Sequence, residues 1–132
     1  MRRIFTQLML AASIMLVLAV ILGAFGAHAL RDRLGDHGTD IWHTANRYHF
    51  YHGIAMLVVL MLGRMFYYPR ILWLAAFMFL LGIVCFSGSL YLLALHTSWH
   101  WLGPVTPVGG LFFLAGWLMC VVALFNLQAK DA

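Results

Sequence analysis

Charge is what this sequence has least of. It contains no glutamate, four aspartates and eight lysines or arginines, so charged residues make up only 9% of its 132 residues. Soluble domains carry about 25% charged and roughly 45–50% apolar residues, whereas 64% of this chain is apolar. So few charges cannot cover the surface of a water-soluble globule of this size. The composition excludes a soluble protein and predicts one membrane domain over residues 1–132.

Cysteine and the usual catalytic motifs are also scarce. The two cysteines, Cys85 and Cys120, lie in separate apolar segments and form no C-x-x-C pair, so neither thiol redox chemistry nor a disulfide is expected. No apolar segment contains an acidic residue, which excludes the proton-coupling carboxylate of the smallest membrane exporters. There is no Ser-His-Asp spacing, phosphate-binding loop or carboxylate pair either. The sequence therefore gives no reason to expect an enzyme.

What the chain does contain is four apolar segments, each a candidate helix across about 30 Å of hydrocarbon. The second has the shortest charge-free run, but Thr39 and Asp40 are suitable N-cap residues that place its helix start near Ile41. The sequence thus predicts an all-α, polytopic four-helix membrane bundle. The expected spans are residues 4–27, 41–63, 71–95 and 106–127.

The distribution of lysine and arginine predicts the orientation of the four spans. With four crossings, five cations fall on the side of the termini and three on the other side, so both termini are predicted to be cytoplasmic. The cations sit at span ends and form no patch, which disfavours nucleic acid and leaves the lipid bilayer as the expected partner. The first group is Arg2, Arg3, Arg64, Arg70 and Lys130, and the second is Arg31, Arg33 and Arg47.

A cleaved signal peptide is the alternative interpretation of the first segment. Two arginines precede its apolar run, and Ala27-His28-Ala29 resembles a cleavage site. The run is longer than the usual 7–15 residues, so we expect the segment to be retained. Sequencing the mature N-terminus decides between the two, and cleavage would leave three spans.

Small residues predict where the helices touch, because close backbone approach stabilises helix pairs in lipid. The expected packing positions fall toward the predicted outer side, so the bundle should be tightest there. The same positions would equally suit a homo-oligomer face, and the sequence leaves that alternative open. They are Gly23, Gly26, Gly53, Gly88, Gly109 and Gly110.

All seven histidines fall on the predicted outer side, and His52 is expected below the membrane interface. An ionisable group at that depth is a functional candidate. The preferred interpretation is an interhelical hydrogen bond, worth about 0.6 kcal/mol on average. The alternative is a transition-metal or haem site in which His52 acts with His28, His49 or His96, although no zinc spacing or C-x-x-C-H haem signature is present. Sensing of external pH is a third interpretation.

Several segments together resemble a known family over almost the whole chain. They are GAFGAH at 23–28, YHFYHGIAML at 48–57, FSGSLY at 86–91, and TPVGG at 106–110 followed by Gly116-Trp117. In these segments the chain resembles the YgdD/YwdK family of small bacterial inner-membrane proteins, which has a mitochondrial relative in animals. The resemblance implies four transmembrane helices and a multi-pass location in the bacterial inner membrane, but no activity. Of the histidines, only His28 and His52 are carried over with the matching motifs.

These observations lead to two functional hypotheses. The first is a non-catalytic accessory or structural membrane component, such as a subunit of a larger complex, with no cofactor. The second is a metal- or haem-binding protein that uses His28 and His52 for metal handling or electron transfer. A channel is disfavoured because nothing polar lines the inner half of the spans.

Overall fold

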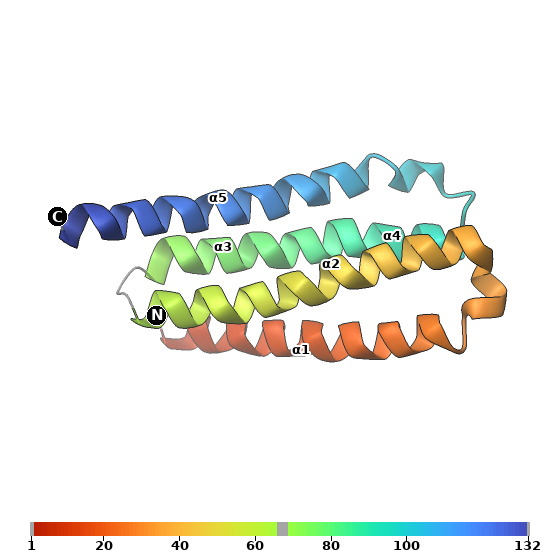
Figure 1. Ribbon diagram of the computed structural model, residues 1–132, viewed down its shortest axis with the longest axis horizontal. Coiled ribbons are helices and arrows are strands. Elements are labelled where there is room, and N and C mark those ends of the chain that lie inside the picture. The colour runs from red at the N-terminus through yellow and green to blue at the C-terminus, as the bar shows by residue number, and fades with distance from the viewer. Residues whose placement is uncertain (1, 66–68, 132) are drawn as a thin grey trace.

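The structure, a computed structural model, describes residues 2–65 and 69–131 (Figure 1). The described residues contain helices and no strand, which confirms the all-α prediction. α3, the π-helical turn η1 and α4 follow one another without interruption, so the fold consists of four helical rods. In order, the elements are α1 Arg2–Ala27, α2 Arg31–Met65, α3 Pro69–Gly82, η1 Ile83–Ser87, α4 Gly88–Leu95, the 3₁₀ turn η2 His100–Leu102, and α5 Val105–Asp131.

The four rods lie side by side and antiparallel (Figure 1). α2 packs against α1 on one side and against α3 and α4 on the other, while α5 packs against α3 and η1. α1 and α5 are therefore the two edges of the arrangement. Both chain ends lie at one end of the bundle, and the connections around residues 28–30 and 96–104 lie at the opposite end. Residues 28–30 and 96–104 are thus at the same end of the bundle, whereas four membrane crossings stay a prediction.

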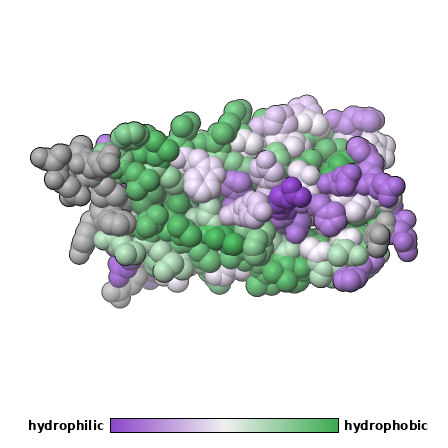
Figure 2. Space-filling view, viewed as in Figure 1, coloured by the Kyte–Doolittle hydropathy of each residue, from purple (hydrophilic) through white to green (hydrophobic). Residues whose placement is uncertain are grey.

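Among residues 2–65 and 69–131, three helical segments are long and apolar enough to cross a membrane, namely Arg3–Ala27, Arg70–Leu95 and His100–Asn126. They contain most of the first, third and fourth predicted spans. The second predicted span, 41–63, is not among them, because the tyrosines, histidines and arginines in and beside it lower its hydropathy. Its charge-free run between Arg47 and Arg64 is about 24 Å long at 1.5 Å per residue. In the face shown in Figure 2, hydrophilic residues gather at the end of the bundle that carries the 28–30 and 96–104 connections.

α2 begins earlier than the predicted start at Ile41. It opens at Arg31 and is interrupted at Gly35, which has φ 63° and ψ −178°. Glycine adopts this left-handed conformation without the steric cost that a side chain would add. The chain turns at Gly35 and the helix then resumes, so Asp40 lies inside the helix rather than at its start. The polar residues from Asp36 onward therefore belong to the long continuous part of α2, and residues 31–34 form a short turn before the kink.

The buried core has two parts. The larger cluster lies between α2, α3 and α5, where Met56, Leu60 and Phe79 are fully buried. A smaller cluster around Trp42 and Tyr91 joins α2 to α4 nearer the polar end of the bundle. The buried polar side chains considered below lie in or beside these two clusters.

Candidate functional site

Two polar side chains of α2 bind the backbone of α1. The indole Nε1 of Trp42 donates a hydrogen bond to the carbonyl oxygen of Leu22 at 2.8 Å. One turn further along α2, the amide Nδ2 of Asn46 donates to the carbonyl oxygen of Ala19 at 2.7 Å. Helix carbonyls already accept one bond from within the helix, but each oxygen has a second lone pair that can accept another. α1 and α2 are thus joined by interhelical hydrogen bonds as well as by packing.

Glycines on α1 make room for these two donors. A Cβ atom on Gly26 would lie 2.3 Å from the Trp42 ring, and one on Gly23 would lie 3.0 Å from Asn46 Oδ1. Further along the same pair of helices, the glycine lies on α2, where a Cβ on Gly53 would lie 2.8 Å from a side-chain atom of α1. At three of the glycines selected from the sequence, a side chain of the partner helix thus packs directly against the glycine backbone, which leaves no room for a larger residue.

Tyr91 extends this arrangement to α4. Its hydroxyl oxygen lies 3.1 Å from Asn46 Nδ2, which donates to it, and 3.4 Å from His49 Nδ1. In the contact between Tyr91 and His49, the tautomer of the imidazole determines whether the hydroxyl or Nδ1 is the donor. His49 Nε2 is buried without a hydrogen bond of normal geometry, and the backbone of Met15 on α1 is its polar neighbour. We call Trp42, Asn46, His49 and Tyr91 the Asn46 network, and it links α1, α2 and α4.

His52 belongs to a separate arrangement between α2 and α5. The indole N–H of Trp117 can only donate, so His52 Nε2 accepts this bond, at 3.2 Å. Its Nδ1 then carries the proton and donates to the carbonyl oxygen of Tyr48 at 2.8 Å. The imidazole also stacks on Phe113, with ring centroids 3.5 Å apart and planes inclined by 13°. Both ring nitrogens of this buried histidine are engaged, one of them across helices.

The remaining histidines of the hypothetical ligand set lie elsewhere. His28 is exposed just beyond α1, and His96 is exposed and stacked on Trp99 with ring centroids 4.5 Å apart. His49 and His52 are close in sequence but belong to different arrangements. Among the residues that the structure describes, no group of three or more His, Cys, Asp or Glu side chains is placed to hold a metal ion. A metal or haem site therefore stays a prediction, to be tested by metal analysis and absorption spectroscopy of the purified protein.

The other selected glycines differ in how closely they are packed. A Cβ on Gly109 would lie 2.2 Å from the backbone nitrogen of Phe86, so α5 and η1 touch there through their backbones. A Cβ on Gly88 would lie 3.9 Å from the carbonyl oxygen of Ile83, and one on Gly110 would lie 3.9 Å from the ring of Phe86, both of which are ordinary contacts. The same substitution should therefore have different effects at these positions.

Two closely packed glycines were missed by the sequence interpretation. A Cβ on Gly82 would lie 2.3 Å from the ring of Phe113, and one on Gly116 would lie 2.5 Å from the ring of Phe79. Each is a single glycine in an apolar run, so the only signal in the sequence is the presence of large aromatic residues within a few positions on either side of it. Close approach between α3 and α5 thus extends beyond the outer part of the bundle, where the sequence predicted the tightest packing.

Comparison with known proteins places the chain in a family. Residues 22–110 match the family model described as "Protein of unknown function (DUF423)". The chain is 43% identical over 107 residues to the UPF0382 membrane protein YwdK of Bacillus subtilis, covering 81% of this chain and 86% of the relative. A UPF0382 membrane protein of Staphylococcus epidermidis is 45% identical over 107 residues, covering 81% of this chain and 85% of that one.

A third relative gives the same picture. A UPF0382 membrane protein of Staphylococcus haemolyticus is 41% identical over 110 residues, covering 83% of this chain and 88% of the relative. No solved structure matches the chain significantly. The names of these relatives give a membrane location and no activity, and the resemblance to the YgdD/YwdK family is confirmed. The chain is therefore a member of the DUF423 family of membrane proteins, whose function is unknown.

Proposed function

We propose that this protein is a non-catalytic accessory or structural component of the bacterial inner membrane. The observation that carries the proposal is how its buried polar groups are used. Both ring nitrogens of His52 and the amide nitrogen of Asn46 are engaged in hydrogen bonds, which join α2 to α5, α1 and α4. A histidine that acts as a general base or ligand needs a nitrogen lone pair directed at a substrate or metal. Here the polar side chains stabilise the bundle instead.

The proposal includes four membrane crossings with both termini in the cytoplasm. α2 lies between α1 and the α3–α4 rod, so it is positioned to cross with them. Its short apolar run is compatible with crossing, because a long arginine side chain such as that of Arg47 can extend toward the headgroups. Arg3, Arg64 and Arg70 stand at the end that carries the termini, which favours that end as the cytoplasmic one.

Cysteine labelling tests this topology. With Cys85 and Cys120 replaced by alanine, single cysteines are introduced as His37→Cys and Ser98→Cys. A maleimide that cannot cross membranes should label both from the periplasmic side in intact spheroplasts. Labelling of the two positions from opposite sides would contradict four crossings.

Copurification tests the functional role. Tagged protein is isolated from native membranes beside His52→Phe, which retains an aromatic ring for stacking but removes both hydrogen bonds of the imidazole. An accessory subunit should bring down a stoichiometric partner, and this variant should retain that partner once folded amounts are equalised. Stoichiometric metal or haem in the wild type that is lost in His52→Phe, with no partner in either sample, would overturn the proposal.

A further inference from the structure

A shallow groove lies between α1 and α3 at the end of the bundle that carries the chain termini. α1 and α3 both pack on α2 and contact each other over only a short stretch, which leaves the groove between them. Its volume is about 450 Å³, within the range typical of ligand sites. The groove is lined by Ile4 and Leu8 from α1 and by Arg70, Trp73, Leu74 and Phe77 from α3.

One end of this groove is charged. Arg70 lines it from the first turn of α3, where the apolar segment Arg70–Leu95 begins, and its side chain is exposed. Within the described part of the chain, the guanidinium has no hydrogen-bond or ion-pair partner. Trp73, one turn further along, is of the residue type that settles at the membrane interface. The charged end of the groove therefore lies where α3 enters the membrane, and the apolar lining continues inward from it.

Two further arginines raise the positive potential at this end. The guanidinium carbon of Arg64 lies 6.0 Å from the ring centroid of Phe5, and that ring lies 6.4 Å from the ring of Trp73. Arg3 directly precedes the groove residue Ile4 and is exposed. Three of the four aspartates of the chain lie near the start of α2, at the opposite end of the bundle. An anionic group is thus favoured at the charged end of the groove.

We propose that this groove binds an anionic phospholipid, with the phosphate on Arg70 and one acyl chain along the apolar lining. From Arg70 to Phe77 the groove runs about 10 Å at 1.5 Å per residue, about two thirds of one leaflet of a hydrocarbon core about 30 Å thick. Basic pockets between transmembrane helices on the cytoplasmic side bind anionic headgroups in this way. The site goes beyond the proposed accessory role, and only its assignment to the inner leaflet rests on the proposed topology.

Charge favours a lipid over a second copy of this chain as the occupant. A copy inserted in the same orientation would bring its own arginines to the same level, so the two ends would repel each other. The one aspartate near that end of the sequence, Asp131, directly follows Lys130. An anionic phospholipid supplies both a phosphate at the depth of Arg70 and an apolar chain below it.

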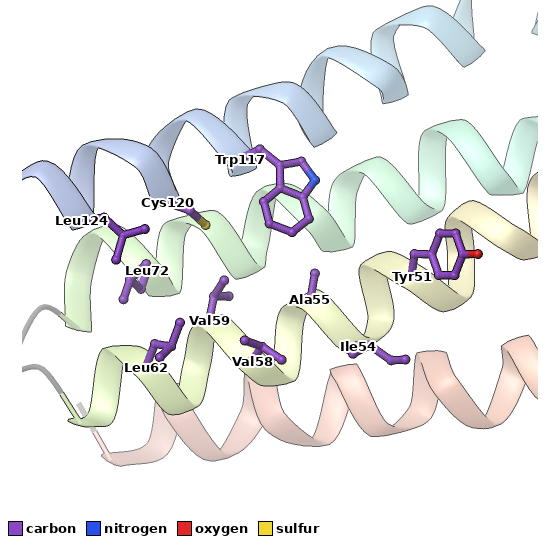
Figure 3. Close-up of a pocket in the computed structure, with 10 residues that line it drawn as sticks. All are labelled: Tyr51, Ile54, Ala55, Val58, Val59, Leu62, Leu72, Trp117, Cys120 and Leu124. Carbon is purple, nitrogen blue, oxygen red and sulfur yellow. The ribbon is translucent and has the colours of Figure 1, made fainter.

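A larger groove between α2 and α5 lacks this charged end (Figure 3). Its volume is about 540 Å³, and its lining includes Val58 and Leu62 from α2 and Leu124 from α5. None of the residues that line it is charged, so it offers no contact for a phosphate. It serves below as the control surface for the groove between α1 and α3.

Native mass spectrometry of the full chain in detergent tests the headgroup contact. The protein is titrated with phosphatidylglycerol or phosphatidylcholine of the same acyl composition, and the wild type should bind phosphatidylglycerol about fivefold more tightly. Arg70→Gln should weaken phosphatidylglycerol binding about tenfold, because it removes charge-assisted hydrogen bonds, and Arg70→Lys should weaken it less, because the charge is retained. Arg33→Gln removes an exposed arginine at the opposite end and should bind like the wild type.

Filling the groove tests where the acyl chain lies. Leu74→Trp places a larger side chain in the groove, at a residue that is 46% exposed, and should weaken phosphatidylglycerol binding at least about tenfold. Its matched control is Val58→Trp, at a residue that is 48% exposed in the groove between α2 and α5, and this variant should bind like the wild type. Circular dichroism verifies folding, and if Leu74→Trp does not fold, Arg70→Gln still decides the outcome.

Two results would overturn the proposal. Equal affinity for the two lipids, with Arg70→Gln binding like the wild type, would mean that the lipid is a non-specific annular molecule. A wild-type dimer that Leu74→Trp converts to a monomer, with lipid binding unchanged, would mean that a second copy occupies the groove. Binding in detergent does not depend on the orientation of the protein in a membrane, so failure of this proposal is distinguishable from failure of the proposed topology.

Discussion

Two adjacent glycines of α5 should respond in opposite ways to the same substitution. A methyl group on Gly109 would lie 2.2 Å from the backbone nitrogen of Phe86 and 2.7 Å from its Cα. Backbone atoms cannot rotate away as a side chain can, so α5 would have to move by roughly 1 Å to restore normal contacts. A methyl group on Gly110 would meet only a ring atom of Phe86, at 3.9 Å.

The magnitudes follow from two opposing contributions. Either Gly→Ala substitution gains up to about 1 kcal/mol of helix propensity. At Gly109 the displacement of α5 adds an overpacking penalty of about 1–3 kcal/mol or more, and it also loosens the contacts of Gly82 and Gly116 along the same interface. We expect Gly109→Ala to destabilise the protein by about 2 kcal/mol and Gly110→Ala to be neutral or to stabilise it by up to about 1 kcal/mol.

Reversible unfolding by sodium dodecyl sulfate in mixed micelles, followed by circular dichroism, measures the difference. Gly109→Ala should unfold at a clearly lower detergent mole fraction than the wild type, and Gly110→Ala at the same or a higher one. Equal midpoints for the two variants would refute the close approach of α5 to η1, as would a larger loss at Gly110.

Other predictions concern the outer part of the bundle and the histidines. Gly26→Leu should lower the folded yield far more than His37→Ala, because the new side chain collides with the indole of Trp42 on α2 whereas His37 is exposed. Fluorescence-detected gel filtration measures the folded yield, and equal yields for the two variants would contradict the prediction. Tyr91→Phe removes the bridging hydroxyl of the Asn46 network and should lower the free energy of unfolding by about 0.6–1.7 kcal/mol in the same detergent assay. Tyr51→Phe is the control and should leave the free energy of unfolding unchanged, because the Tyr51 hydroxyl binds nothing within the described chain. His52→Phe should stay folded and lose less than about 2 kcal/mol, because the stacking surface is retained; a variant that cannot fold would show that the hydrogen bonds are essential.

The sequence predicted the rods better than the contacts between them. The extents of α1, of the α3–α4 rod and of α5 follow from the lengths of apolar runs, which is local information. The start of α2 could not be predicted in this way. It depends on the turn at Gly35 and on the packing of Gly38 against the carbonyl oxygen of Ala94, a residue distant in sequence.

The histidines show the same division between local and distant information. A spacing of three residues placed His49 and His52 on one side of α2, and both are buried. An angular difference of about 60° between their directions is nevertheless enough to give them different neighbours. His49 meets Tyr91 of α4, and His52 meets Trp117 of α5. Which helix stands opposite each histidine is set by the arrangement of the rods, and the sequence spacing does not contain it.

The π turn η1 has a consequence for how the third rod can change. Relative to a regular α-helix, such a turn accommodates one additional residue. Because the turn takes up the extra residue, removing one residue between Ile83 and Ser87 should restore an ordinary helix and leave Phe79 before it and Tyr91 after it facing their present neighbours. Converting the turn to a regular α-helix at full length would instead rotate α4 by up to about 100° relative to α3, and Tyr91 would move away from Asn46. The widened turn thus keeps both halves of one continuous rod in contact with their own neighbours.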